Sequence, residues 1–306
     1  ILEFRNALAF WRRQKMYKEI GIVGQGFVGT AVREGFENVT KVYTYDKYKP
    51  SHSNCRTLSE LCVKAKMIFI CVPTPMNADG SCNLDIVKEV IIAADELSTK
   101  EHILVLKSTV PPGTTDHLNS LMRNATVVFN PEFLTEANYV EDFRNQDRII
   151  IGGTRPASTK VKNLYRKRFP VTPIIKTGTK TAEMVKYFCN CLLATKVSFA
   201  NEMKQVCDKK DIDYDKVVEY SLYDSRLGKT HLSSPGPDGK LGFGGSCFPK
   251  DVGAMINYMK LNEINSTVLS AVWEKNIEVR PEKDWEDLEG RAVVTNYNLG
   301  DKNETF

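Results

Sequence analysis

The sequence lacks the usual marks of a membrane, metal-binding or disulfide-stabilised protein. No apolar run approaches the roughly 20 residues that a membrane-spanning helix needs, so we expect no membrane association. The eight cysteines include no paired C-x-x-C spacing, which argues against both a zinc site and a disulfide framework. We therefore predict no metal ion, and most cysteines should be buried thiols in the reducing cytoplasm.

An excess of charge of one sign is also missing. The 42 basic and 38 acidic residues give a net charge of +4, and no basic stretch is interleaved with aromatic residues. This balance gives no indication of nucleic-acid binding. A length of 306 residues favours about two domains with a sizeable core.

Residues 1–15 precede the first methionine, Met16. They lack the longer apolar core and the small-residue cleavage site of a signal peptide. We expect a leader that is non-native or extended, with translation starting near Met16. An amphipathic helix that packs on the first domain is the alternative.

Short apolar runs alternate with helical patterns, such as Leu84–Leu97, through residue 176. This alternation predicts an α/β fold, a Rossmann-like doubly wound parallel sheet with helices on both faces, over residues 16–178. Ligands of such sheets gather at the carboxyl ends of the strands. The predicted strands are Ile20–Val23, Lys41–Tyr45, Met67–Val72, Ile103–Leu106, Val127–Asn130, Ile149–Ile151 and Val171–Ile175.

The pattern becomes helical from residue 177. Residues 179–208 contain neither proline nor glycine and predict one long helix, of a kind that often forms a dimer core. We therefore expect an all-helical dimerisation domain over residues 179–280, and a homodimer. Further helices are predicted at Asp213–Tyr223, Asp251–Lys260 and Ser266–Val279.

Two segments of this second half are not helical. Ser233–Gly245 is rich in glycine and proline, which predicts a long loop, and such loops are frequently functional. The tail of residues 281–306 is short and polar, with room for one strand at Arg291–Asn296.

The first predicted strand runs into Gly24-Gln25-Gly26-Phe27-Val28-Gly29, and a helical pattern follows. Between a strand and a helix, with an acid about 20 residues further on, this spacing is a dinucleotide fingerprint. Gly24 and Gly26 allow the tight turn and the approach of a pyrophosphate, which faces the helix N-terminus at Phe27 and Val28. Gly29 allows close packing of helix and strand. A glycine turn without a ligand is the alternative.

The acid at the expected distance is Asp46, which ends the second predicted strand. Its carboxylate would accept hydrogen bonds from the adenosine ribose, which favours NAD over NADP. Lys47 and Lys49 follow closely and would weaken that preference.

A second glycine-rich stretch, Gly242–Asp251, reads GFGGSCFPKD. It places Cys247 in a glycine-rich turn with Lys250 three residues on. Glycines let backbone and ligand approach closely, and a nearby ammonium favours the thiolate, the nucleophilic form of cysteine. The alternative is a buried cysteine beside a loop.

The segment Asn130–Glu136 reads NPEFLTE. Pro131 suits the first position of a helix capped by Asn130, and Glu132 and Glu136 would then share one helix face. Taken alone, this is an ordinary helix start.

Together these segments resemble the nucleotide-sugar dehydrogenase family, the UDP-glucose 6-dehydrogenase and GDP-mannose 6-dehydrogenase group. The resemblance runs in order from about Tyr17 to about Lys260. The four histidines lie outside its motifs, so no histidine base is expected. Besides the segments already described, the motifs are Cys71–Pro75, Lys107–Gly113, Asp142–Gly152, and Ala182–Lys186 with Asn190.

The resemblance implies a four-electron oxidation of a primary alcohol of a sugar nucleotide to a carboxylate by two NAD, without a metal. Cys247 would add to the intermediate aldehyde as a thiohemiacetal, which a second hydride transfer converts to a thioester that water hydrolyses. Lys186 would stabilise the oxyanion, Asn190 would hold substrate or water, and Asp251 would take protons through a water. Thr109 would help to hold that water, and Glu132 would be the base for thioester hydrolysis.

The resemblance also implies the binding residues, with Glu136 near the nicotinamide, Lys250 in a supporting role, and Arg226 reaching the substrate across a dimer. The cofactor-binding residues are expected to be Gly24, Gly26, Phe27, Val28, Gly29, Asp46, Thr74, Pro75, Thr109, Glu136 and Lys250. The substrate-binding residues are expected to be Phe133, Leu134, Thr135, Glu136, Lys186, Asn190, Arg226, Phe243 and Gly244.

Several readings of function stay open. UDP-glucose is the expected substrate, with GDP-mannose, UDP-N-acetylmannosamine and UDP-N-acetylglucosamine as alternatives, in capsule or polysaccharide precursor synthesis. Family members usually carry a second Rossmann-like domain where this sequence has only residues 281–306, so an NAD-binding dimeric remnant with an incomplete substrate site is a second hypothesis. A two-electron hydroxyacid dehydrogenase is a third, but those enzymes have no nucleophilic cysteine.

Overall fold

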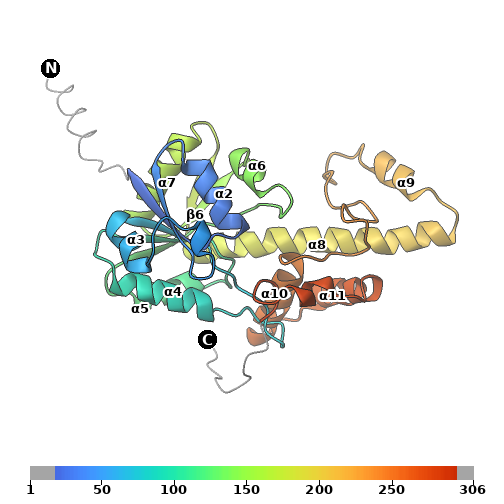
Figure 1. Ribbon diagram of the computed structural model, residues 1–306. Helices are drawn as coiled ribbons and strands as arrows, with labels where there is room; N and C mark the ends of the chain where they lie inside the picture. The colour runs from blue at the N-terminus through green and yellow to red at the C-terminus, as the bar shows by residue number, and fades with distance from the viewer. Residues whose placement is uncertain (1–17, 295–306) are drawn as a thin grey trace. The chain divides into compact units, whose positions relative to one another are not determined.

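The computed structural model describes residues 18–294, which divide into two compact units. The first unit contains the residues up to Val72 and Asp85–Lys186, and the second contains Pro73–Leu84 and the residues from Tyr187 onward (Figure 1). The division falls within helix α8 (Thr179–Lys209), at whose start the domain boundary was predicted. The predicted leader, residues 1–15, lies outside the described residues.

The first unit is built on a seven-stranded sheet of order β2-β1-β3-β4-β5-β6-β7. Strands β1 to β5 are parallel, and β6 pairs antiparallel with β5 and parallel with β7. The winding direction reverses at β1, and ligands bind at the strand ends beside such a reversal. The predicted doubly wound sheet is confirmed, with one antiparallel pair. The strands are β1 (Glu19–Val23), β2 (Lys41–Tyr45), β3 (Met67–Ile70), β4 (Ile103–Leu106), β5 (Thr126–Phe129), β6 (Ile149–Gly152) and β7 (Ile174–Thr177).

Helices cover both faces of this sheet. Helices α2 (Phe27–Phe36), α6 (Tyr139–Arg144) and α7 (Ala157–Arg168) pack on one face around a core that includes Phe36, Phe143 and Tyr165. Figure 1 shows the other three on the opposite face. These are α3 (Leu58–Lys64), α4 (Asp85–Glu96) and α5 (Thr114–Leu121).

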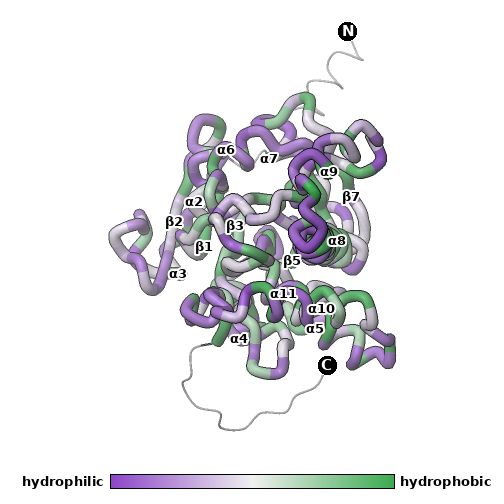
Figure 2. The backbone as a smooth tube through the Cα atoms, turned by 90° about the vertical axis from the view of Figure 1, so that its right-hand side faces the viewer, coloured by the Kyte–Doolittle hydropathy of each residue, from purple (hydrophilic) through white to green (hydrophobic). Residues whose placement is uncertain are grey.

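Helix α7 illustrates how a polar sequence forms a core helix. Figure 2 shows it mainly hydrophilic, yet Val161, Leu164 and Tyr165 are buried in the core. Their spacing of three and four residues places them on one stripe that faces the sheet. The last turn of α7 carries the basic residues Arg166, Lys167 and Arg168, whose positive charges are favourable at the negative end of the helix dipole.

The second unit is helical, as predicted. Its core combines Tyr187 and Cys191 of α8, Val252 of α10 (Phe248–Leu261) and Val272 of α11 (Thr267–Val279) with Phe243 of the loop before α10. Helix α10 begins at Phe248, three residues earlier than predicted. The helices are α9 (Tyr214–Ser221), α10 (Phe248–Leu261) and α11 (Thr267–Val279), and α8 continues through this unit to Lys209.

Two local predictions are wrong. No helix begins after Asn130, because the side chain of Asn130 does not cap the next residues but donates to the Ile150 carbonyl at 2.7 Å. The last strand of the sheet does not start at Val171, which is 90 % exposed, because prolines at positions 170 and 173 cannot donate ladder hydrogen bonds.

A strand was expected at Arg291–Asn296. The part of this segment that the structure describes, up to residue 294, does not form a strand. Val293 makes isolated bridges with Met76 and Glu289, and positions 295–296 lie outside the described residues. Within residues 18–294, no helix has the length and hydropathy that a membrane crossing requires. The same residues contain no group of three histidine, cysteine or acidic side chains arranged to hold a metal ion.

Candidate active site

The turn between β1 and α2 has a separate geometric role for each of its glycines. Gly24 has φ +89°, and a Cβ there would lie 2.4 Å from the Cys71 carbonyl oxygen. A Cβ on Gly29 would lie 1.9 Å from the Gly24 carbonyl oxygen, so the third glycine lets the helix pack closely. A Cβ on Gly26 would meet nothing within 4 Å, which leaves the helix N-terminus open to a ligand.

The carboxylate of Asp46 holds this turn to the end of β2. It accepts from the backbone N–H of Gln25 at 2.7 Å and from those of Tyr48 and Lys49 at 2.9 Å each. Gln25 Oε1 is buried without a hydrogen-bond partner in the described chain. An open helix N-terminus with Phe27 and Val28 in its first turn, an orphaned acceptor and a fixed carboxylate fit a dinucleotide with a free ribose diol.

Glu132 and Lys186 form a buried ion pair in the first unit. Lys186 Nζ lies 2.9 Å from Glu132 Oε1, and the two side chains are 4 % and 9 % exposed. Burial acts to raise the pKa of Glu132, but the Lys186 charge and the Leu134 N–H, which donates to Glu132 Oε2, lower it below its ordinary value. Glu132 is therefore a carboxylate at neutral pH, ready to accept a proton or to orient a water.

Lys107 is a third buried charge beside this pair, and sequence analysis gave it no role. Its Nζ donates to Asn130 Oδ1 at 3.3 Å and to the Pro131 carbonyl at 3.2 Å. Burial lowers the pKa of Lys107 to about 8. The lysine thus fixes the segment that carries Glu132. A lysine directly after the apolar run Ile103–Leu106 was the available signal.

The other predicted residues of this unit are spread around the same segment. Two cations lie over the ring of Phe133. The Arg148 guanidinium is 4.1 Å and the Lys186 ammonium 5.6 Å from the ring centroid. Thr135 donates to Asp142 through both its N–H and its hydroxyl. Thr109 is buried, whereas Leu134 and Glu136 are half-buried. Because no helix forms here, Glu132 and Glu136 do not share a helix face.

In the second unit, Asp251 joins two other predicted residues. Asn190 donates to Asp251 Oδ2 at 2.5 Å, and Lys250 Nζ donates to Asp251 Oδ1 at 2.6 Å. The Asp251 side chain is 2 % exposed. With both oxygens engaged, this carboxylate can act on a substrate only through its remaining lone pairs or a water.

Cys247 is the N-cap residue of α10 and is half-buried. Burial acts to lower the pKa of the Lys250 ammonium, but the charges of Asp251 and of the Cys247 thiolate raise it above its ordinary value. A helix N-terminus and a lysine both favour the thiolate of Cys247. Burial has the opposite effect on other thiols of the chain, since it raises the pKa of Cys82 to about 11 and that of Cys71 to about 12.

The remaining predicted residues differ in exposure. Thr74 is buried in the second unit, next to Pro75, and Phe243 and Gly244 belong to the loop before Cys247. Arg226 is 86 % exposed at its side chain, where its guanidinium pairs with Asp224. Nothing in the described chain holds Arg226 against another predicted residue.

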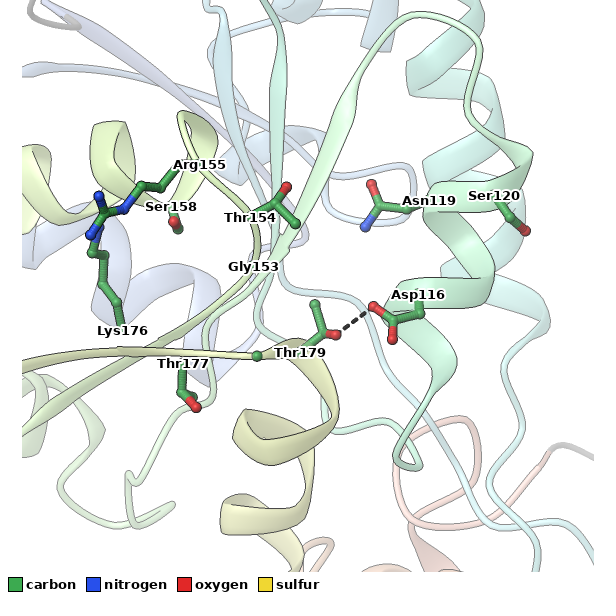
Figure 3. Close-up of a pocket in the computed structure, with 11 residues that line it drawn as sticks. Asp116, Asn119, Ser120, Gly153, Thr154, Arg155, Ser158, Lys176, Thr177 and Thr179 are labelled. Carbon is green, nitrogen blue, oxygen red and sulfur yellow. Dashed lines mark hydrogen bonds between the residues drawn. The ribbon is translucent and has the colours of Figure 1, made fainter.

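A cleft of about 800 Å³ lies elsewhere on the first unit (Figure 3). It is found at the carboxyl ends of β6 and β7, where Asp116 accepts a hydrogen bond from Thr179. These strands run opposite to β1–β5, so the cleft and the glycine turn lie at opposite edges of the sheet. No predicted site residue lines it.

Comparison with known proteins finds one family in both units. Residues 37–169 match the NAD binding domain of the UDP-glucose/GDP-mannose dehydrogenase family, and residues 180–278 match its central domain. The glycine turn at positions 24–29 precedes the first match, so its interpretation rests on its own geometry.

Individual relatives give the same result. The chain is 39 % identical over 220 residues to a UDP-glucose 6-dehydrogenase of Rickettsia bellii, covering 69 % of this chain and 49 % of the relative. It is 36 % identical over 217 residues to UDP-glucose 6-dehydrogenase TuaD of Bacillus subtilis, covering 69 % of this chain and 46 % of the relative. The chain thus spans about half the length of the curated relatives it matches.

A solved structure agrees over a longer stretch. A UDP-glucose dehydrogenase from the archaeon Pyrobaculum islandicum superposes with a TM-score of 0.78 at 29 % identity, covering 90 % of this chain and 71 % of that chain. The fold of both units is therefore that of a nucleotide-sugar dehydrogenase.

Proposed function

Because the chain belongs to the UDP-glucose/GDP-mannose dehydrogenase family, we propose that it oxidises the sugar alcohol of UDP-glucose to a carboxylate with two NAD. The observation that carries this proposal is the placement of Cys247 at the N-terminus of α10, next to the Lys250–Asp251–Asn190 cluster. An enzyme that oxidises an alcohol only once needs no such thiol. The names of the relatives support UDP-glucose over the other nucleotide sugars.

In this proposal each group of site residues carries out one part of the reaction. Two NAD molecules, held in turn at the glycine turn and Asp46, would each accept one hydride. The Cys247 thiolate adds to the aldehyde carbon, and Lys186 stabilises the oxygen that becomes negative. Asp251, held by Asn190, relays the proton released from the alcohol through a water placed with Thr109. Glu132 removes a proton from the water that attacks the thioester, and the thiolate leaves.

Both clusters are assigned to one reaction because helix α8 carries a member of each. Lys186 and Asn190 are four residues apart on this uninterrupted helix, so they lie on one face about one turn apart. The backbone of Phe133–Glu136 and the loop with Phe243 and Gly244 are proposed to contact the sugar nucleotide. Glu136 is proposed to lie near the nicotinamide, with Thr74 and Pro75 also on the cofactor.

Counting NADH against limiting sugar tests the proposal. The purified chain is incubated with excess NAD and each of UDP-glucose, GDP-mannose and UDP-N-acetylmannosamine. Two NADH per UDP-glucose are expected, because the thioester route takes four electrons from one carbon. One NADH per sugar would contradict the role of the thiol. No turnover with any sugar, despite measured NAD binding, would favour a remnant with an incomplete substrate site.

Asp46→Ala is expected to weaken NAD binding by about 1–3 kcal/mol, the scale of a lost hydrogen bond to a charged group. The carboxylate is proposed to accept hydrogen bonds from the ribose, and it also accepts from Gln25 N–H in the glycine turn. Calorimetric titration of NAD measures the change, with Glu89→Ala, an exposed partner of Lys47, as the control. Equal affinities of the two variants would mean that the fingerprint is misread.

We also propose that the chain is a homodimer that works in the cytoplasm. Helix α8 exposes Phe188, Leu192, Phe199 and Val206 at 50 % or more, with spacings of four and seven residues. Such a stripe on one helix face suits a second copy of the same helix. The proposed role of Arg226 across the dimer follows from this pairing. All eight cysteines are free thiols, which is typical of proteins in the reducing cytoplasm.

Light scattering is expected to give twice the chain mass of 34.6 kDa. Phe199→Asp should shift the mass toward the monomer, because it places a charge in the apolar stripe. Val268→Asp is the control, since Val268 is exposed to 68 % but lies on α11. A monomer in the parent chain would contradict the proposal.

A further inference from the structure

The loop that leads to Cys247 contains three glycines between positions 242 and 245, so its own sequence does not fix its conformation. The buried amide of Asn276 on α11 constrains the loop at Phe243, next to Gly242, whose N–H donates to Asn201 Oδ1 at 3.2 Å. Asn276 Oδ1 accepts from the Phe243 N–H at 2.7 Å, and Asn276 Nδ2 donates to the Phe243 carbonyl at 2.9 Å. Both hydrogen-bonding groups of one loop residue are thereby held by a side chain that is fully buried.

Arg280, one turn further along, holds the same loop at other residues. Its guanidinium donates to the Leu241 carbonyl at 3.2 Å and pairs with Asp238 at 2.7 Å. Asp284 receives two further hydrogen bonds, at 2.6 Å and 2.9 Å. The arginine is 2 % exposed, so its charge is compensated almost entirely by this loop and by Asp284.

The glycines of the loop make room for these two side chains. A Cβ on Gly242 would lie 2.5 Å from Asn276 Oδ1, and a Cβ on Gly244 would lie 2.5 Å from Arg280 Nη2. Gly242 also has φ +68°, which few other residues adopt. The loop therefore approaches Asn276 and Arg280 more closely than a Cβ at either glycine would allow.

We propose that Asn276 and Arg280 are positioning residues that hold the Leu241–Gly245 backbone and thereby keep Cys247 at the N-terminus of α10. Neither residue belongs to the motifs that identified the site. Phe243 is only four residues before the thiol, so a loop released at Phe243 lets Cys247 leave the N-cap position. Away from the N-cap position, the thiol of Cys247 loses its interactions with the helix dipole and with the Lys250 ammonium, both of which favour the thiolate. The effect on sugar oxidation rests on the proposed function, but the effect on the thiol does not.

The test measures the rate of Cys247 alkylation by iodoacetamide as a function of pH, by mass spectrometry of the peptide. Asn276→Ala is expected to move the midpoint of this profile upward by about one pH unit, toward that of an ordinary thiol. Glu278→Ala is the matched control, because Glu278 lies on the same helix and accepts hydrogen bonds from Gln205 and Lys275 at the surface. The control should keep the parent midpoint. Cys189 on α8 serves as the reference thiol in each sample.

Arg280→Lys is the second variant, because it keeps the charge but loses the forked contacts with Leu241, Asp238 and Asp284. If circular dichroism shows that Asn276→Ala does not fold, the Arg280→Lys variant tests the proposal instead. A folded variant with the parent midpoint overturns the proposal. So does an equal rise in the alkylation of Cys189 and Cys247, which would mean general loosening of the unit.

The activity measurement separates this proposal from the proposed function. With UDP-glucose, Asn276→Ala is expected to lower kcat on the order of 10²-fold with a smaller change in KM, since misplacing a nucleophile by about 1 Å has that effect. If the midpoint shifts but the parent chain oxidises no sugar, the positioning role stands and the proposed function fails.

Discussion

Cys247→Ala is expected to abolish formation of the acid product while leaving NAD binding unchanged. The first hydride can still leave the alcohol, but the resulting aldehyde has no tetrahedral adduct from which to lose a second hydride. Loss of a catalytic nucleophile lowers kcat by a factor on the order of 10⁴ or more. The dinucleotide turn is built from Gly24, Gly29 and Asp46 of the other unit, so the affinity for NAD should not change.

The measurement is uronate formation by chromatography, together with NADH counted per sugar. Cys82→Ala is the matched control, because Cys82 also lies near Lys250 but burial raises the pKa of its thiol to about 11. This variant should retain acid formation. Undiminished uronate production by Cys247→Ala would contradict the thioester mechanism, whatever the number of NADH formed per sugar.

Lys186→Met is expected to have the largest effect on stability, a loss of about 3–5 kcal/mol in the free energy of unfolding. It removes the ammonium 2.9 Å from Glu132 and leaves a carboxylate buried without its charge partner. Urea denaturation measures the loss. Lys204→Met is the control, because Lys204 pairs with Asp208 at the surface of the same helix, where such a pair contributes only about 0.3–0.5 kcal/mol.

A double variant distinguishes whether the loss of stability comes from the unpaired carboxylate or from lost packing. Adding Glu132→Gln to Lys186→Met removes the unpaired charge and should restore much of the stability, since an amide is far less costly to bury. Activity should stay lost, because both the oxyanion partner and the proposed base are gone. If the double variant is as unstable as the single one, the loss comes from packing of the lysine stem.

Much of the fold could be predicted because its signals are local. Strands such as Ile103–Leu106 are short, apolar and fully buried, and α8 contains no residue that would interrupt it. The error at Asn130 has a tertiary cause. Its amide accepts from Lys107 and Tyr165 and donates to Ile150, so the capping role that its sequence position suggests is not available.

The catalytic residue types could be predicted from motifs, but their supports could not. Lys107 contacts a loop more than twenty positions away, and Asn276 and Arg280 hold a loop more than thirty positions away. Nothing in the local sequence of α11 distinguishes a buried asparagine or arginine from surface residues. Such supports become visible only once the chain is folded.

The uninterrupted course of α8 has a consequence for how this sequence can change. Each residue turns an α-helix by about 100°, so inserting one residue between Lys186 and Asn190 would rotate everything that follows by that angle. The lysine and the amide would then point in different directions, although every other residue were kept. Insertions and deletions should therefore be tolerated after Lys209 but not within these few positions, where the spacing itself carries the information.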